Sequence, residues 1–204
     1  MKVCGITNLD NALMCENYGA NALGFIFYKE SKRYISPDDA KNIIKNLSPF
    51  TIKVGVFVNE SAENINRISS ETKLDLVQLH GDENPALLKE IELPAIKSFR
   101  VKDNFDFSTL NDYKNCSHLL DTYTSNGFGG SGKIFNWNII PKNILNKIIL
   151  SGGVSINNIE TIYNDIKPSA VDLSSSLEIE PGKKDEQKVK EFFNKIYSLR
   201  SKTW

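Results

Sequence analysis

The chain has 204 residues, in which 25 Lys and Arg balance 25 Asp and Glu, and its sequence pI is near 6.7. This balance excludes a general electrostatic attraction to nucleic acid or to an anionic membrane, so we expect neither as a partner. No apolar run approaches the ~18 residues that span a bilayer, and the first residues do not resemble an export signal. We therefore expect a cytoplasmic protein.

The cysteines and histidines are few. Cys4, Cys15 and Cys116 form neither a CxxC pair nor a zinc-binding spacing, and their number is odd. A cytoplasmic compartment also keeps thiols reduced. With only His80 and His118 as histidines, we expect no metal site. The disulfide and metal interpretations of Cys4 are therefore weak, which leaves a buried small residue or a reactive thiol.

Short β-branched and apolar runs alternate with longer amphipathic ones along the chain. The predicted strands cover residues 1–6, 22–27, 53–59, 75–80, 95–100, 118–122, 147–152 and 170–174. Helical patterns cover residues 8–18, 107–113 and 185–199, and others begin near residues 36, 61, 84 and 155. Ser36 is a predicted N-cap followed by proline at the first helical position, and Ser61 is a second predicted N-cap.

Strand–helix alternation predicts parallel strands joined by helical crossovers. Eight such units in about 200 residues predict an α/β fold, a single-domain (β/α)8 TIM barrel over residues 1–204. An open doubly wound sheet usually has fewer strands for this length, and no G-x-G-x-x-G follows the first strand. The longest irregular stretch, residues 123–136, is rich in glycine and serine, and we expect it to be an active-site loop.

In such a barrel the chemistry lies at the C-terminal ends of the strands. Cys4 ends the first predicted strand, His80 the fourth and Asp121 the sixth. Each also has a structural interpretation: His80 as a hydrogen-bonded rim histidine, and Asp121 as a turn cap. Lys2 faces the same way as Cys4, and barrel closure brings the eighth strand beside the first. We therefore predict that Lys2 pairs with Asp172, because buried charges rarely go unpaired.

The segments LSGGV (150–154) and DLSSSLE (172–178) end the seventh and eighth predicted strands. Loops at these two places often build a phosphate site in such barrels. Glycines let backbone amides approach an anion, and serine hydroxyls add donors. We therefore favour a phosphorylated small molecule as the ligand over two ordinary glycine-serine turns.

Two charged segments have less specific interpretations. Arg33, in SKRYIS (31–36), follows the second predicted strand and is either an exposed charge or a bidentate clamp for a carboxylate. The run of Lys183, Lys184 and Asp185 most simply opens the last helix on a solvated face.

With these residues in view, the chain resembles the phosphoribosylanthranilate isomerase family of tryptophan biosynthesis. The matching segments occur in the family's order and span nearly the whole chain. They are KVCGIT (2–7), LGFIFYKESKRYIS (23–36), VGVFVN (54–59), VQLHGDE (77–83), LLDT (119–122), GGSGKIFNW (129–137), LSGGV (150–154), VDLSSSLE (171–178) and PGKKD (181–185).

The resemblance implies a cofactor-independent aldose–ketose isomerase. Its reaction is the Amadori rearrangement of N-(5-phosphoribosyl)anthranilate to 1-(2-carboxyphenylamino)-1-deoxyribulose 5-phosphate. Cys4 matches the general base that removes the C2 proton, and Asp121 the general acid that opens the furanose ring. Arg33 matches the residue at the anthranilate carboxylate, and His80 a rim position near the substrate. The other expected substrate-binding residues are Gly152, Gly153, Asp172, Ser175 and Ser176.

The resemblance also leaves questions for the structure. For base work Cys4 must become a thiolate, which Lys2 or the first turn of the following helix would stabilise. The family usually has glycine where this chain has Ser176, and a glycine there permits positive φ and close phosphate approach. Family members are commonly monomers and some are dimers, so we expect a monomer in preference to a dimer.

Two other functions stay open on the residues alone. The first is another phosphosugar isomerase or epimerase barrel, although a metal-dependent epimerase needs more histidines than this chain has. The second is a non-catalytic binder of phosphorylated ligands, which has no need of both Cys4 and Asp121.

Overall fold

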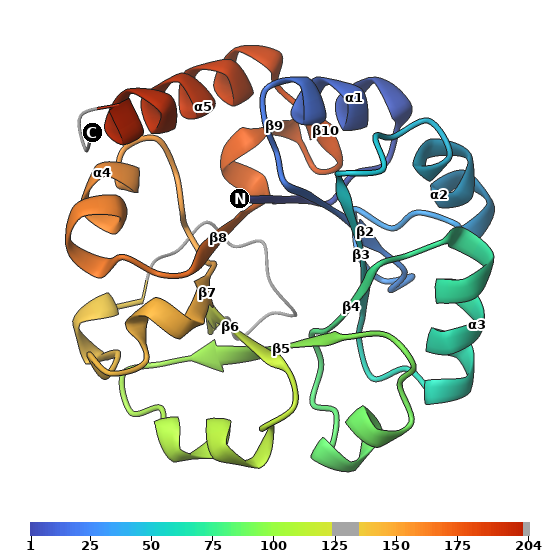
Figure 1. Ribbon diagram of the computed structural model, residues 1–204, viewed down its shortest axis with the longest axis horizontal. Coiled ribbons are helices and arrows are strands. Elements are labelled where there is room, and N and C mark those ends of the chain that lie inside the picture. Colours follow the sequence, from blue (N-terminus) through green and yellow to red (C-terminus); the bar gives the residue numbers. More distant parts are fainter. Residues whose placement is uncertain (124–134, 202–204) are drawn as a thin grey trace.

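Eight parallel strands close into a barrel in the computed structural model, which describes residues 1–123 and 135–201 (Figure 1). The strands run in chain order around the barrel, and β8 pairs with β1 to close it. Their bounds are Lys2–Cys4 (β1), Ala22–Ile26 (β2), Ile52–Phe57 (β3), Leu76–Leu79 (β4), Ala95–Val101 (β5), Ser117–Thr122 (β6), Ile148–Leu150 (β7) and Ala170–Leu173 (β8). The predicted (β/α)8 barrel is confirmed, and each predicted strand lies within about two residues of its observed bounds.

Helices form an outer ring around the strands (Figure 1). The α-helices are Leu9–Asn17 (α1), Pro37–Ile44 (α2), Ala62–Thr72 (α3), Ile159–Thr161 (α4) and Glu186–Ser201 (α5). The predicted caps are confirmed, because the Ser36 side chain accepts a hydrogen bond from the backbone N–H of Asp39 and Ser61 does the same for Asn64. These caps fix where α2 and α3 leave the rim of the barrel.

Several connections are tighter than the sequence pattern predicts. Short 3-10 helices at Pro85–Lys89 and Phe107–Asp112 replace the helices expected after β4 and β5. The connection from Leu79 to Ala95 is short, and its first residues form a loop, so little chain remains for a regular helix. The helix expected near Ser155 is α4, which continues as a π-helix, Ile162–Ile166. The remaining 3-10 helices are Trp137–Ile139, Leu145–Lys147 and Ser175–Leu177.

A small antiparallel hairpin, which the sequence did not predict, lies between β8 and α5. Its strands are Glu178–Glu180 (β9) and Lys183–Lys184 (β10). The expectation that Lys184 lies on a solvated helix face is wrong, because its side chain is fully buried. Lys184 belongs to β10 rather than to α5, and the hairpin turns it inward onto Glu178.

The apolar core has two parts. The larger part fills the space between the strands and the surrounding helices. The smaller part lies on the inward-facing side of the strands, and its members are Val54, Ile96 and Leu119 with Ala22, Leu76 and Ile149 packed against them. In the same interior Lys2 and Asp172 occupy paired positions of β1 and β8, and Lys2 Nζ lies 2.9 Å from Asp172 Oδ2. The predicted Lys2–Asp172 pair is therefore confirmed.

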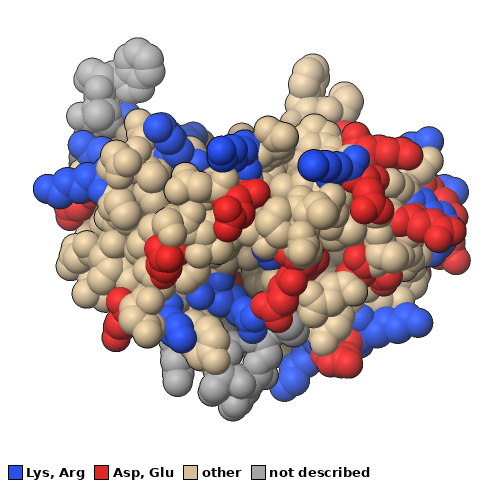
Figure 2. Space-filling model, turned by 90° about the horizontal axis from the view of Figure 1, so that it is seen from below, with Lys and Arg blue, Asp and Glu red and all other residues tan. Residues whose placement is uncertain are grey.

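The surface carries charges of both signs. Figure 2 shows acidic and basic side chains interspersed over the face that it presents. Among the residues that the structure describes, no helix is both long enough and apolar enough to cross a membrane.

Candidate active site

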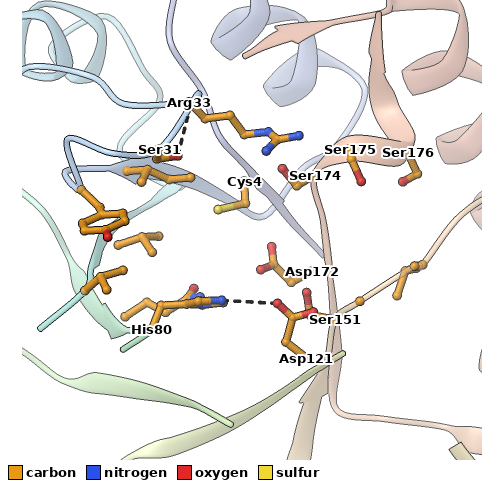
Figure 3. A pocket seen from close by; sticks show the side chains of 18 residues that line it. Cys4, Ser31, Arg33, His80, Asp121, Ser151, Asp172, Ser174, Ser175 and Ser176 are labelled. Carbon is orange, nitrogen blue, oxygen red and sulfur yellow. Dashed lines mark hydrogen bonds and ion pairs between the residues drawn. The ribbon is translucent and has the colours of Figure 1, made fainter. Parts of the chain in front are cut away.

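One pocket at the C-terminal end of the barrel gathers every predicted site residue (Figure 3). Those residues are Cys4, Arg33, His80, Asp121, Gly152, Gly153, Asp172, Ser175 and Ser176. They come from segments spread over the whole sequence, and the closed barrel brings their strand ends to one rim. The structure thus brings the whole set together at this rim, and the roles of these residues stay predictions.

The pocket also contains residues that the sequence analysis did not single out as site residues. Polar ones are Tyr28, Ser31, Gln78, Ser151 and Ser174, and apolar ones are Ile26, Val56, Val58 and Val154. The apolar group gives the pocket a wall on which an aromatic ring can pack. Its members carry no sequence signal, because a β-branched residue at a strand end looks the same whether it lines a pocket or a core.

Cys4 ends β1 and is buried, and it forms no disulfide. Burial raises the pKa of the Cys4 thiol above its ordinary value of 9.0, and the Lys2 ammonium acts in the opposite direction. The net shift is upward, so Cys4 is a thiol in the free protein near neutral pH. Lys2, and to a smaller extent Lys184, favour the thiolate, whereas burial and the Asp172 charge oppose it.

Lys2 is held as an ammonium by its surroundings. Burial alone lowers its pKa, but the Asp172 carboxylate and Cys4 raise it, and the net shift is upward. Asp172 binds Lys2 through Oδ2, whereas its Oδ1 is buried and accepts no hydrogen bond from any described residue. Since Asp172 lines the pocket, Oδ1 is available to a ligand hydroxyl.

Asp121 is buried at the end of β6, and both of its oxygens have neighbours. Oδ1 accepts a 2.7 Å hydrogen bond from the backbone N–H of Thr122, and Oδ2 lies 3.3 Å from Nε2 of His80. Gly152 covers this carboxyl from the β7 loop, with φ of +76°. A Cβ atom on Gly152 would lie 2.7 Å from Asp121 Oδ1 and 2.3 Å from Thr122 Oγ1, so only glycine fits there.

His80 is oriented from the side opposite Asp121. Its Nδ1 lies 2.9 Å from the Gln78 amide nitrogen, which also donates to Ser98 Oγ at 3.1 Å. Because an amide nitrogen can only donate, Nδ1 is assigned as the acceptor and Nε2 carries the hydrogen that faces Asp121. A chain of polar contacts therefore runs from Ser98 through Gln78 and His80 to Asp121.

Arg33 is neither exposed nor alone, so its interpretation as an exposed charge is wrong. Its side chain is only 13% exposed, and it forms a bidentate ion pair with Glu178. Arg33 Nη2 lies 2.6 Å from Glu178 Oε2, and Nε lies 2.9 Å from Oε1. One edge of the guanidinium is thus occupied, while Arg33 still lines the pocket.

The predicted phosphate segments meet on one side of the pocket (Figure 3). Gly152 and Gly153 both have positive φ, of +76° and +74°. Ser176 does not, so serine is accommodated without backbone strain where the family usually has glycine. The Ser176 hydroxyl oxygen is buried and has no hydrogen-bond partner among the described residues.

Two sequence predictions concern other parts of the site. Residues 124–134 of the predicted active-site loop, and with them most of the GGSGKIFNW motif, lie outside the described residues, so the role of this loop stays a prediction. Within residues 1–123 and 135–201, no three His, Cys, Asp or Glu side chains group in a way that holds a metal ion.

Comparison with known proteins decides the family. The family model described as N-(5'-phosphoribosyl)anthranilate (PRA) isomerase matches residues 1–195. The chain belongs to this family. It is 44% identical over 203 residues to the N-(5'-phosphoribosyl)anthranilate isomerase of Thermotoga neapolitana, and the match covers 98% of each chain.

Solved structures of phosphoribosylanthranilate isomerases share the fold. One contains reduced 1-(o-carboxyphenylamino)-1-deoxyribulose 5-phosphate and matches with a TM-score of 0.86, 39% identity and 97% coverage of each chain. Another, of monomers of the dimeric enzyme from Thermotoga maritima, matches with a TM-score of 0.85, 38% identity and the same coverage. The chain is thus a phosphoribosylanthranilate isomerase family enzyme of tryptophan biosynthesis, and the family predicted from its motifs is confirmed.

Proposed function

We propose that this chain rearranges N-(5-phosphoribosyl)anthranilate with Asp121 as general acid and Cys4 as general base. The observation that carries the proposal is that both side chains line one pocket, Cys4 from β1 and Asp121 from β6. In Figure 3 Asp172 is drawn between them. An acid and a base that enter from different strands suit a sugar that must be protonated at one atom and deprotonated at another.

In the first step Asp121 gives its proton to the furanose ring oxygen. The bond between C1 and that oxygen breaks, and the nitrogen lone pair of the anthranilate forms the C1=N bond of a Schiff base. Asp121 must hold its carboxyl in one orientation for this transfer. The hydrogen bond from Thr122 N and the contact with His80 Nε2 restrict its rotation.

In the second step the Cys4 thiolate removes the proton from C2. The C–H electrons form a C1=C2 bond and the C=N electrons return to nitrogen, which gives an enolamine that tautomerises to the C2 ketone. Because burial favours the neutral thiol, the positive charge of Lys2 supports this step by stabilising the thiolate. The ring opening and the removal of the C2 proton are each assigned to a side chain, so these two steps of the proposed mechanism use no cofactor and no metal.

The remaining residues bind the substrate in this proposal. Gly152, Gly153, Ser175 and Ser176 hold the phosphate, and the buried Ser176 hydroxyl is a ready donor. Arg33 binds the anthranilate carboxylate through the guanidinium edge that Glu178 leaves open. These groups correspond to those of the compound bound in one solved relative, reduced 1-(o-carboxyphenylamino)-1-deoxyribulose 5-phosphate, which carries a carboxylate, sugar hydroxyls and a phosphate.

Asp172 completes the set through its Oδ1 atom. That atom accepts no hydrogen bond from a described residue, although it is buried in the pocket wall. A sugar hydroxyl that donates to Oδ1 would satisfy it, and unsatisfied buried acceptors are costly.

A fluorescence assay tests the assignment of acid and base. Phosphoribosylanthranilate made in situ should disappear with the wild-type chain and persist with Cys4→Ala or Asp121→Asn. Each loss should be about 10²- to 10⁴-fold in kcat, the usual contribution of a positioned acid or base. Cys116→Ala is the matched control, because Cys116 is a free thiol that does not line the pocket. Equal turnover by all four proteins would contradict the assignment of Cys4 as the base and Asp121 as the acid.

We also propose that the chain acts as a monomer in the cytoplasm. The described residues assigned to the reaction all line one pocket of a single chain, which supports a monomer. Free cysteines suit a reducing compartment. Sedimentation at the concentration of the assay tests the monomer, and a dimer like that of the Thermotoga maritima relative would contradict it.

A further inference from the structure

Three charged side chains form a cluster just outside the pocket, at the β9–β10 hairpin. Glu178 lies at its centre, between Arg33 and Lys184, and its carboxylate side chain is only 4% exposed. Lys184 Nζ lies 2.7 Å from Glu178 Oε1, and its side chain is fully buried. Of the three residues only Arg33 lines the pocket. Glu178 and Lys184 therefore act on a ligand only through other groups.

Glu178 fixes the orientation of the Arg33 guanidinium. Arg33 uses Nε and Nη2 for the carboxylate, at 2.6 to 3.0 Å. Arg33 Nη1 makes no hydrogen bond to a described residue, so the Nη1–Nη2 edge stays open. A planar guanidinium with one edge fixed presents the other edge in one direction, which suits a second carboxylate. The stem of Arg33 also packs closely over Gly5, because a Cβ atom there would lie only 2.6 Å from Arg33 Cδ.

Lys184 sets the charge of the cluster. An isolated Arg33–Glu178 pair is neutral and has little attraction for an incoming anion, whereas the third charge returns the cluster to a net +1. Lys184 also donates to two backbone carbonyls, those of Cys4 at 2.6 Å and Ser174 at 3.4 Å. Its three N–H groups are thus fully used, and they join the ends of β1 and β8 beside the pocket.

Glu178 stays ionised in this setting. Burial alone raises its pKa, but the hydrogen bonds from Arg33 and the charge of Lys184 outweigh burial and hold the pKa below its ordinary value. Both carboxylate oxygens accept hydrogen bonds, and Oε1 accepts a further one, at 3.3 Å, from the backbone N–H of Gly182. The three charges therefore form one satisfied unit rather than a loose surface contact.

We propose that Glu178 and Lys184 are positioning residues that make the pocket selective for a substrate with a carboxylate on its aromatic ring. Glu178 aims the open edge of Arg33, and Lys184 keeps the cluster positive. The inference rests on the proposed role of Arg33 and adds two residues that contact no substrate. It predicts that these two residues control discrimination between carboxylated and uncarboxylated ligands.

The test compares two stable ligands in each protein. The first is reduced 1-(o-carboxyphenylamino)-1-deoxyribulose 5-phosphate, and the second is the same compound without the carboxyl group. Isothermal titration gives both Kd values. The Kd of the ligand without the carboxyl group, divided by the Kd of the carboxylated ligand, measures recognition of the carboxylate. A general loss of structure weakens both ligands alike, so it leaves this ratio unchanged. The ratio is also independent of the fraction of the protein that is folded.

In the wild type the carboxylated ligand should bind more tightly, and the ratio should fall by roughly tenfold in Glu178→Gln and in Lys184→Met, the scale of one hydrogen bond to a charged group. Glu178→Gln separates positioning from charge. It raises the cluster charge, so a purely electrostatic role predicts a larger ratio, whereas positioning predicts a smaller one. A larger or unchanged ratio in Glu178→Gln overturns the proposal.

The hairpin provides matched controls. Glu180→Gln and Lys183→Met alter the same strands, but both side chains are mainly exposed and, among the described residues, form an ion pair only with each other, at 3.9 Å. Their ratios should stay within twofold of the wild type. Arg33→Met separates the proposed role of Arg33 in binding the carboxylate from the proposed positioning of Arg33 by Glu178 and Lys184. If Arg33→Met leaves the ratio unchanged, the proposed role of Arg33 itself fails. If Arg33→Met abolishes discrimination while Glu178→Gln and Lys184→Met retain it, only the positioning inference fails.

Discussion

The Nε2 atom of His80 lies 3.3 Å from the Oδ2 atom of Asp121, inside the rim of the barrel. The other ring nitrogen of His80 is held by Gln78, which in turn binds Ser98. The proposed general acid is therefore oriented by a chain of side chains from β4 and β5, none of which needs to react. Through these contacts Gln78 and Ser98 can affect catalysis by way of Asp121.

A double-mutant cycle tests this chain. Gln78→Met keeps the side-chain length but removes the amide that holds His80 Nδ1, so kcat should fall roughly tenfold, a coupling of about 1.4 kcal/mol. In the Asp121→Asn background the same change should have little further effect, because the oriented acid is already absent. Steady-state kinetics of the four proteins give the coupling. Fully additive losses would show that Gln78 acts by another route.

The second prediction concerns the charge beside Cys4. The Lys2 ammonium lowers a thiol pKa that burial raises, so Lys2→Met should raise the Cys4 pKa further. At any fixed pH a smaller fraction of Cys4 is then in the thiolate form. The increase in the rate of Cys4 alkylation by iodoacetamide with rising pH should therefore occur at higher pH. Mass spectrometry distinguishes Cys4 from Cys15 and Cys116, and the alkaline limb of kcat/KM should move in the same direction.

Lys53→Met is the control for this experiment. Lys53 also pairs with an aspartate, Asp75, at 3.0 Å, but it does not line the pocket. Its removal should leave the pH dependence of Cys4 alkylation unchanged. An alkylation profile of Lys2→Met that coincides with the wild type, or moves to lower pH, would contradict the stabilising role of Lys2.

The fold and the polar residues at the strand ends were predictable because their signals are local. Apolar runs separated by amphipathic ones identify the strands, and a polar residue at the end of such a run falls on the rim once the barrel is known. Cys4, His80 and Asp121 were found in this way. The Lys2–Asp172 pair also followed, because side chains alternate along a strand and the last strand must close on the first.

The Arg33–Glu178–Lys184 cluster was not predictable from the same signals. Arg33 and Glu178 are 145 residues apart, and Lys184 and Cys4 are 180 apart, so no local period relates them. The charged run at 183–185 has the composition of a solvated helix start, and only the hairpin before α5 turns Lys184 inward. Long-range ion pairs of this kind depend on where a short loop folds back, which sequence periodicity does not report.

The third prediction concerns the stability of the barrel interior. Lys2 and Asp172 form a buried ion pair, so Lys2→Met leaves Asp172 as a buried charge without its partner. The free energy of unfolding should fall by about 3–5 kcal/mol, whereas Lys2→Met combined with Asp172→Leu should cost less, because both charges are gone. Urea unfolding measures the free energy of unfolding of both variants.

Glu71→Gln is the control, because it breaks the exposed Arg67–Glu71 pair and should lower the free energy of unfolding by under about 1 kcal/mol. Equal costs for the buried and exposed pairs would contradict the prediction.

The last prediction links the phosphate loop to the acid. Gly152→Ala places a methyl group where Asp121 Oδ1 and the Thr122 backbone already lie, and it does so at a φ of +76°. The loop or the carboxyl must move, so KM should rise and kcat should fall together, each by about tenfold or more, with a stability loss of roughly 1–2 kcal/mol from the left-handed backbone alone. Gly19→Ala is the control for that backbone cost, because Gly19 also has positive φ but follows α1 on the outside of the barrel, against the half-exposed Tyr197. It should lose stability and keep its kinetic constants. If Gly152→Ala also loses only stability, the loop after β7 positions neither the phosphate nor Asp121.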